Sequence, residues 1–232
     1  MKLYVIRHGL SVANANGVIQ GHANSDLADI GLRQADLLGR YFNAENINPE
    51  VIYTSPLERA HATARGISGR LDPSPPVVTM DGLKEVDVGA LSGMPMEDAH
   101  AKYPAAWAPD VNKWLDFSGF GGESLDDFFR RVEGSVRKVM DEWPDPLADR
   151  TIFFTVHAGT MRPLLKTLLD ASGDFMFFTF GNCSHAVIEY RELRSGIRRV
   201  LSDLVRIETV ARLMGEENPA KGTEDTVGNK IG

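Results

Sequence analysis

The sequence predicts an α/β fold with a mainly parallel central sheet that helices cover. Short apolar segments alternate with amphipathic segments along most of the 232 residues, and this alternation is typical of parallel strands joined by helices. The end of the chain differs, because Ala186–Tyr190 and Arg198–Ile207 are strand-like segments separated by a turn at Arg194–Gly196. We expect this last pair to be antiparallel and to close the sheet.

Four apolar segments are the expected parallel strands. Each is short and ends abruptly at polar residues, as buried strands of an open sheet do. These segments are Leu3–Ile6, Val51–Thr54, Val77–Met80 and Thr151–Val156.

The helices are predicted from apolar spacing and from capping residues. Ile30–Phe42 carries apolar residues on one helical face, and a helix is expected from about Thr160 to Asp170. The segment Ser55-Pro56-Leu57-Glu58 has the pattern of a capping box and predicts a helix that ends near Gly69. Ser124 is expected to cap a further helix.

That further helix has a continuous apolar stripe and ends near Trp143, which two prolines follow closely. Arg130 and Arg131 fall on its polar face. We interpret both arginines as solvated residues of that face.

Two regions depart from the strand–helix rhythm. Gly93–Gly122 contains several aromatic residues and methionines, and we expect a flap subdomain inserted beside the sheet. Gly215–Gly232 has little apolar content, which predicts a disordered tail after one domain spanning residues 1–214.

Composition excludes several classes of protein. A net charge of −7 argues against a protein that coats nucleic acid. The chain has one cysteine, Cys183, which rules out an intrachain disulfide and suits a reducing cytoplasm. We expect Cys183 to be a small buried residue. No apolar stretch approaches the roughly 20 residues of a membrane helix, so we expect a cytoplasmic protein without membrane partners.

Charged side chains follow the ends of the expected strands. Arg7 and His8 follow the first, Arg59 and Glu85 come after the second and third, and His157 follows the fourth. Because the carboxyl ends of parallel strands line one edge of a sheet, we expect these five side chains to converge.

This set of side chains suits phosphoryl chemistry. The planar fork of arginine binds a phosphoryl group in bidentate fashion, and the helix N-termini after His8 and His157 are expected to add N–H donors. A neutral histidine can attack phosphorus, and a partly desolvated glutamate can transfer the protons. No histidine or carboxylate spacing resembles a metal site, and no loop resembles a nucleotide cradle, so we expect no cofactor.

Each of these residues also has a structural interpretation. Arg59 could form a surface salt bridge near Glu58, and His157 could be a buried histidine with its hydrogen bonds satisfied. Glu85 could be merely exposed. The remaining histidines are interpreted as structural or surface residues; they are His22, His61, His100 and His185.

The chain resembles the histidine phosphatase superfamily, the phosphoglycerate-mutase-like proteins, from about Lys2 to Tyr190. The order and spacing of six matching stretches make this resemblance specific. They are VIRHG (residues 5–9), SDLADIGLRQA (25–35), YTSPLERAHATA (53–64), LKEVDVGALSG (83–93), GGES (121–124) and TVHAGTMRPLL (155–165).

The resemblance implies a three-layer α/β/α sandwich and a phosphohistidine at His8, with Glu85 as proton donor. It also implies a set of residues that bind the phosphate or substrate: Arg7, Asn14, Gln20, Gly21, Arg59, Glu85, His157 and Ala158. Two residues depart from the family pattern. Leu10 replaces the usual glutamate or glutamine, and Ala158 replaces the first glycine of His-Gly-Gly. Neither change removes a group expected to touch phosphorus.

Among members of that family, the sequence favours hydrolysis over phosphoryl transfer to a second substrate. Family mutases have a longer insertion with adjacent arginines, whereas Glu85–Gly122 contains only Lys102, Lys113 and His100 as basic residues. We expect a histidine acid phosphatase-type hydrolase acting on a small organic phosphate. A phosphoglycerate mutase and a silent phosphate-binding module are the alternatives, and a homodimer is left open. The aromatic flap favours a substrate with a ring or apolar group as much as it favours simple packing.

Overall fold

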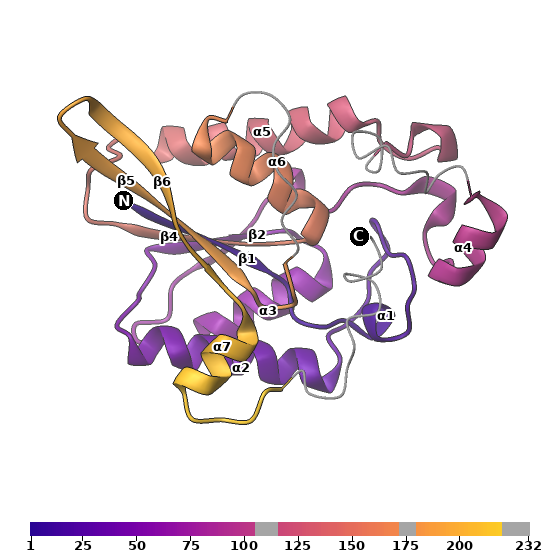
Figure 1. Ribbon diagram of the computed structural model, residues 1–232, viewed down its shortest axis with the longest axis horizontal. Helices are drawn as coiled ribbons and strands as arrows, with labels where there is room; N and C mark the ends of the chain where they lie inside the picture. The colour runs from indigo at the N-terminus through magenta and orange to yellow at the C-terminus, as the bar shows by residue number, and fades with distance from the viewer. Residues whose placement is uncertain (105–115, 172–179, 220–232) are drawn as a thin grey trace.

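Six strands form one mixed sheet in the order β3-β2-β4-β1-β5-β6 (Figure 1). The computed structural model describes residues 1–104, 116–171 and 180–219. The strands are β1 (Lys2–Arg7), β2 (Val51–Thr54), β3 (Val77–Thr79), β4 (Thr151–Val156), β5 (His185–Leu193) and β6 (Gly196–Val205).

Seven helices are described, and most of them cover the two faces of the sheet (Figure 1). They are α1 (Val12–Ala15), α2 (Asp29–Ala44), α3 (Glu58–Ser68), α4 (Met96–Lys102), α5 (Leu125–Glu142), α6 (Ala158–Leu169) and α7 (Ile207–Leu213). Three short 3₁₀ turns are also described: η1 (Asp81–Leu83), η2 (Gly89–Leu91) and η4 (Ser118–Phe120).

The first four strands are parallel and the last two antiparallel. β4 pairs in parallel with β1 and β2, and β2 pairs in parallel with β3. β5 runs antiparallel to both β1 and β6. The expected mainly parallel sheet with a closing antiparallel pair is therefore confirmed.

Alternating side chains of the central strands divide the core into two layers. Leu3 and Val5 of β1 pack in the cluster that includes Phe128 of α5, whereas Tyr4 and Ile6 pack with Phe42 of α2. All six residues are buried. Figure 1 shows α5 and α6 on one side of the sheet and α2, α3 and α7 on the other. The expected three-layer α/β/α sandwich is confirmed.

Most predicted elements are present, with shifted ends. The helix predicted over Ile30–Phe42 is α2, and the one predicted from Thr160 begins two residues earlier, at Ala158. Helix α7 was not predicted. Its buried residues Ile207, Val210 and Ala211 pack in the second layer. Three apolar residues in one short helix are too few to give a periodic signal in the sequence.

The predicted capping box at Ser55 is wrong. Helix α3 begins at Glu58 without a side-chain cap from Leu57. The Ser55 hydroxyl accepts the Leu57 N–H at 3.2 Å, and the N–H of Glu58 is satisfied by the Asn24 side chain at 3.1 Å. Ser55 is therefore not the residue at which α3 is capped.

The predicted flap and tail are described in part. Helix α4 lies within Gly93–Gly122, while residues 105–115 of that segment lie outside the described residues. Residues 220–232 of the predicted tail also lie outside them.

Candidate active site

The ends of three parallel strands bring two histidines together. β1 ends at Arg7, and β4 pairs in register with both β1 and β2. The residues that follow these strands, His8, Ser55 and His157, are therefore neighbours. The ring centroids of His8 and His157 are 5.1 Å apart. The sequence prediction that these two histidines converge is confirmed.

His8 is held in one tautomer. Its Nδ1 lies 2.7 Å from the Gly9 carbonyl oxygen. A carbonyl oxygen only accepts, so Nδ1 carries the hydrogen and Nε2 carries the lone pair. Burial and the nearby guanidinium groups of Arg59 and Arg7 hold the pKa of His8 well below its usual value. The ring is therefore neutral near pH 7 and carries its lone pair on Nε2.

His157 is buried but not fully satisfied. Its Nε2 lies 2.7 Å from the Ser55 hydroxyl oxygen, while Nδ1 has no hydrogen-bond partner among the described residues. Burial, followed by the charges of Arg59, His8 and Arg7, lowers the pKa of His157 strongly. Because buried polar atoms are normally paired, Nδ1 is a candidate contact for a ligand.

Among the described residues, Arg59 is the largest fully buried side chain, with 1% of its surface exposed. Its Nη1 donates to the Ala23 carbonyl at 2.9 Å and its Nη2 to the Gly21 carbonyl at 2.8 Å. Burial lowers the pKa of Arg59 to about 10, although nearby Glu85 opposes this shift. The guanidinium stays cationic near pH 7.

The surface salt bridge considered for Arg59 is absent from the described residues. Glu58 pairs instead with Arg65, at 2.6 Å, on the exposed side of α3. Arg59 points inward to the two carbonyls. Arg7 is also buried, and its Nη1 donates to the Phe180 carbonyl.

Glu85 lies at the N-terminus of α6. One carboxylate oxygen accepts the Gly159 N–H at 3.0 Å, and the other accepts the Thr160 N–H at 3.0 Å. The Thr160 hydroxyl donates to the same second oxygen at 3.2 Å. These contacts place Glu85 beside the residues that follow His157, and its charge acts on Arg59. Glu85 therefore belongs to the same cluster as the two histidines and two arginines.

The N-terminus of α6 is partly occupied by Glu85. The helix after His157 was expected to offer its N–H groups to a phosphate, but those of Gly159 and Thr160 already bind Glu85. The helix after His8 is α1, a single turn of 4 residues capped by Ser11. The two arginine side chains, rather than a long helix, supply the positive charge here, and the two histidines are neutral.

The loop after His8 brings further predicted residues close to the cluster. The Ser11 hydroxyl lies 3.0 Å from Asn14 Oδ1 and 3.2 Å from Gln20 Oε1, and all three side chains are buried. Gly21 contributes the carbonyl that binds Arg59, and its φ of +51° explains the glycine. Ala158 is the exposed first residue of α6.

Sequence reasoning missed the residues around the Glu85 backbone. Arg131 is not a solvated residue of the α5 polar face, because it binds three carbonyl groups and Glu123. His22 also donates to the Glu85 carbonyl, at 2.8 Å. The GGES stretch held the available signal, since its glutamate is Glu123.

The described aromatic residues of the flap favour packing over ligand binding. Tyr103 and Phe120 form an edge-to-face pair with ring centroids 5.1 Å apart. Both pack against the first core layer, as does Phe117. The remaining aromatics of the segment fall within residues 105–115, outside the described residues.

Other features of the described residues carry less chemistry. No group of three or more histidine, cysteine, aspartate or glutamate side chains there could hold a metal ion. No helix among them is long and apolar enough to cross a membrane. Cys183 is buried as expected, and burial raises the pKa of its thiol.

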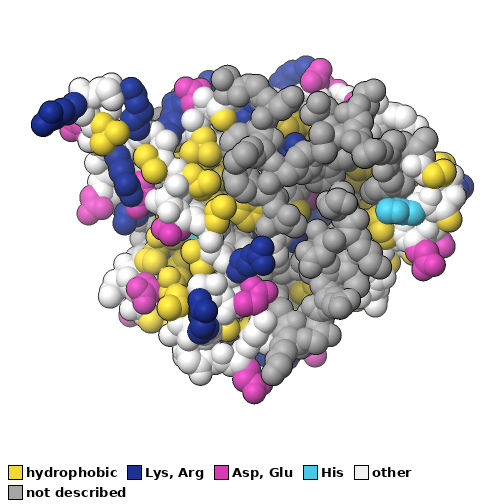
Figure 2. All heavy atoms as spheres, viewed as in Figure 1, with side chains coloured by type: hydrophobic (Ala, Val, Ile, Leu, Met, Phe, Trp, Pro, Cys, Tyr) yellow, Lys and Arg dark blue, Asp and Glu magenta, His cyan; other side chains and the backbone are white. Residues whose placement is uncertain are grey.

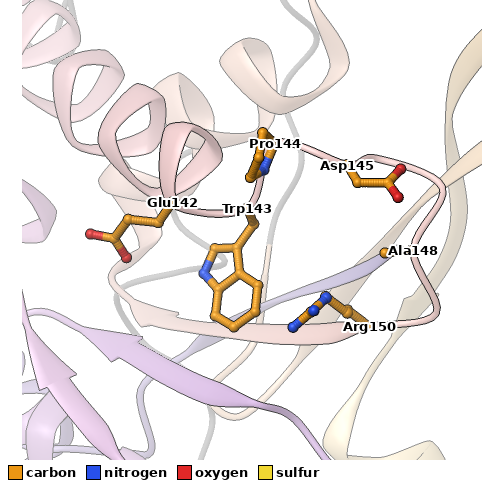
Figure 3. A pocket seen from close by; sticks show the side chains of 6 residues that line it. All are labelled: Glu142, Trp143, Pro144, Asp145, Ala148 and Arg150. Carbon is orange, nitrogen blue, oxygen red and sulfur yellow. The ribbon is translucent and has the colours of Figure 1, made fainter.

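A cavity of about 310 Å³ lies at the opposite end of β4 (Figure 3). Its lining includes Trp143 and Arg150, whose guanidinium carbon lies 4.9 Å from the indole centroid. Trp143 also donates to the Tyr53 hydroxyl at 3.1 Å. These groups satisfy one another, and the cavity is remote from the histidine cluster.

The fold and the site define an α/β protein with a buried cluster of arginines and neutral imidazoles at the carboxyl edge of its parallel strands. A family model described as histidine phosphatase superfamily (branch 1) matches residues 3–215. The chain belongs to that superfamily.

The chain is similar to phosphatases and to a phosphoglycerate mutase. The chain is 33% identical over 205 residues to phosphoserine phosphatase 1 of Hydrogenobacter thermophilus, covering 86% of this chain and 92% of the relative. It is 32% identical over 172 residues to a 2,3-bisphosphoglycerate-dependent phosphoglycerate mutase of a Methylobacterium, covering 72% and 79%. A mycobacterial glucosyl-3-phosphoglycerate phosphatase structure matches with TM-score 0.70 and 26% identity, over 88% of this chain and 97% of that one.

Proposed function

We propose that the protein is a phosphomonoesterase that hydrolyses a small organic phosphate through a phosphohistidine at His8. The observation that carries this proposal is the locked tautomer of His8, whose Nε2 lone pair lies in a cluster with two buried arginines. A neutral nucleophile beside fixed cations suits attack on an anionic phosphoryl group.

The first step forms a bond between His8 Nε2 and phosphorus and breaks the bond between phosphorus and the ester oxygen. Arg7, Arg59 and His157 bind the phosphoryl oxygens, with Asn14 and Gln20 beside them. Glu85 donates a proton to the departing alkoxide.

The second step reverses the role of Glu85. The carboxylate takes a proton from a water molecule, whose oxygen attacks phosphorus and breaks the phosphorus–nitrogen bond. Inorganic phosphate leaves and His8 regains its neutral form. Atoms and protons balance over the two steps, and no further group is needed.

The relatives support hydrolysis of small phosphate esters. The names include phosphoserine phosphatase at 33% identity and glucosyl-3-phosphoglycerate phosphatase at 26%. The mutase relative keeps phosphoryl transfer as the alternative. The few basic residues between Glu85 and Gly122 favour the phosphatase.

We also propose acid-type pH behaviour and a cytoplasmic location. The lowered pKa values of His8 and His157 keep both rings neutral below pH 6.5, so the nucleophile persists into the acid range. The single, buried cysteine is compatible with a reducing compartment. Light scattering of the full chain distinguishes a monomer from a homodimer.

Phosphate release from 4-nitrophenyl phosphate tests the proposal. We expect turnover from acid to neutral pH, and an acid-labile phosphoryl group on quenched enzyme that is absent from His8→Ala. Release no faster than that of His8→Ala would leave a silent binding module. Phosphoglycerate isomerisation with a bisphosphate primer that outpaces phosphate release would establish the mutase instead.

A further inference from the structure

We propose that Arg131 and Glu123 are positioning residues for Glu85. They fix the backbone that carries its carboxyl group. The inference rests on the proposed function, in which Glu85 transfers protons, and it assigns a role to the GGES stretch and to one of the two arginines of α5.

Arg131 binds the backbone on both sides of the Glu85 side chain. Its Nη1 donates to the carbonyls of Gly82 at 3.0 Å and Lys84 at 3.1 Å, and its Nη2 donates to the carbonyl of Glu85 at 3.1 Å. One guanidinium therefore holds three carbonyls within four residues of chain. No regular helix or strand spans residues 84–88, so side-chain donors supply this order.

Glu123 in turn orients Arg131. The carboxylate accepts Nε and Nη2 at 2.7 Å each, in a bidentate pair. Burial raises the pKa of Glu123, but the hydrogen bonds from Arg131 and from the Asp87 N–H outweigh burial and lower it overall. The pair therefore stays ionised near pH 7. The side chains are only 23% and 19% exposed.

Glycines allow residues 82–87 to pack closely against the GGES stretch and α5. A Cβ at Gly122 would lie 2.2 Å from the Asp87 carbonyl oxygen, and one at Gly82 would lie 1.7 Å from the Ser135 hydroxyl oxygen on α5. The backbone of Glu123 also donates to the Asp87 carbonyl at 2.9 Å. Residues 82–87 are thus seated on α5 and on the segment before it.

The Glu85 carbonyl has a second donor. His22 lies in the loop after His8, and its Nε2 donates to the Glu85 carbonyl at 2.8 Å. Its ring faces the carboxylates of Asp87, at 3.8 Å from Nδ1, and Glu123, at 4.0 Å from Nε2. His22 therefore supports the same backbone, and it offers a variant that leaves α5 untouched.

The test compares leaving groups. Loss of a positioned proton donor slows expulsion of a basic alkoxide far more than expulsion of a stable phenolate. The two substrates are 4-nitrobenzyl phosphate and 4-nitrophenyl phosphate, which are similar in size. The measured quantity is kcat/KM, because it reports cleavage of the ester bond and is blind to later hydrolysis of the phosphohistidine.

Glu85→Gln sets the reference, with a selective fall on the benzyl ester. We expect Glu123→Gln and Arg131→Lys to lower kcat/KM for that ester by about 10- to 100-fold, because small misplacement of a catalytic group costs rates of that order. The fall with 4-nitrophenyl phosphate should stay below about threefold. His22→Ala should give the same pattern with a smaller fall.

Arg130→Gln is the matched control. Arg130 is the neighbouring residue on α5, its side chain is 73% exposed, and it pairs with Asp127 at 2.7 Å. We expect this variant to match the wild type on both esters. Thermal unfolding of each variant shows whether the fold is kept, and His22→Ala serves if the Glu123 and Arg131 variants do not fold.

Equal falls on both esters in the Glu123, Arg131 and His22 variants would overturn the positioning role. So would wild-type ratios in these variants while Glu85→Gln stays selective, and the proposed function would then stand. If Glu85→Gln itself shows no selectivity, the proton-donor role fails and the positioning role fails with it.

Discussion

Buried histidines occur in two contrasting regions of this protein. At the carboxyl edge of the sheet, His8 and His157 lie among guanidinium groups. Near the same edge but within the second core layer, His185 of β5 pairs with Ile6 of β1 and lies between aromatic rings, with centroids 5.8 Å from Tyr4 and 5.3 Å from Phe42. Burial lowers the pKa of all three rings, and that of His185 to about 3.

The contrast shows that burial and a lowered pKa do not by themselves mark a functional histidine. His8 has two further properties, a fixed tautomer and cationic neighbours that can hold an anion. For His185 only burial accounts for the shift, and its surroundings are apolar. Charges that face an imidazole separate the chemical site from the structural one.

Substitution of His8, the proposed nucleophile, should reduce activity more than any other change. His8→Asn should lower kcat by more than about 10⁴-fold, the scale on which loss of a covalent nucleophile acts, because no other group in the cluster replaces Nε2. His185→Phe should leave kcat within about threefold, since the ring packs between Tyr4 and Phe42 and burial alone accounts for its lowered pKa. Steady-state hydrolysis of 4-nitrophenyl phosphate measures both. A comparable loss in the two variants would contradict the division.

Arg59 tests the cationic half of the contrast. Arg59→Lys keeps the charge but loses the planar fork and one of the two contacts to the Gly21 and Ala23 carbonyls. We expect kcat/KM to fall by about 10²- to 10³-fold and the affinity for inorganic phosphate to weaken. Arg40→Lys, at a part-buried pair with Asp36 on α2, is the control. Unchanged phosphate affinity in Arg59→Lys would remove this arginine from the anion site.

Gly159, two residues after His157, leaves room for the Glu85 carboxylate. A Cβ at this position would lie 2.5 Å from a Glu85 carboxylate oxygen. Gly159→Ala should therefore displace Glu85 and lower kcat/KM for 4-nitrobenzyl phosphate by about 10- to 100-fold, without comparable loss of thermal stability, because alanine suits a helix. A crystal structure of the variant checks the shift. Full activity with Glu85 in place would refute this explanation.

Acid pH should destabilise both regions. The folded protein keeps His8, His157 and His185 neutral while the unfolded chain protonates them near pH 6.5. The unfolded state therefore binds more protons, and the free energy of unfolding falls as pH decreases below about 6.5. For His185 the loss continues towards pH 3 and reaches about 2 kcal/mol at pH 5.

Denaturant unfolding at pH 7 and pH 5 measures this loss. His185→Phe should make it smaller by the share of that one ring. Added phosphate should also reduce it, because an anion favours protonated His8 and His157, but it should not touch the share of His185. A pH-independent free energy of unfolding between these values would contradict the buried neutral state of the rings.

Much of the fold was predictable because its signals are local. The apolar runs at Val51–Thr54 and Thr151–Val156 match β2 and β4 residue for residue, and Ser124 caps α5 as expected. Ser55 failed because the same residue type that caps helices also binds a histidine across the sheet, a contact 102 positions apart in sequence. Tertiary hydrogen bonds of that kind leave no local pattern.

The site divides in the same way. Arg7, His8, Arg59, Glu85 and His157 were placed together from strand ends, and the structure brings them together. The supporting residues were harder, because Arg131 and its neighbour Arg130 are alike in sequence. Only packing makes one 23% exposed and the other 73% exposed. Which of two adjacent arginines turns inward is decided by the loop that it meets.

The smallest expected effect concerns the residue next to Gly159. Ala158 stands where the resemblance to the family leads us to expect glycine, yet it is exposed at the first position of α6. Ala158→Gly should leave kcat/KM within about threefold and lower the free energy of unfolding by about 0.5–1 kcal/mol, the usual cost of glycine in a helix. Kinetics and denaturant unfolding measure the two. A large gain in kcat/KM would mean that the alanine methyl group obstructs the substrate, and that His157 needs more open backbone than Gly159 alone provides.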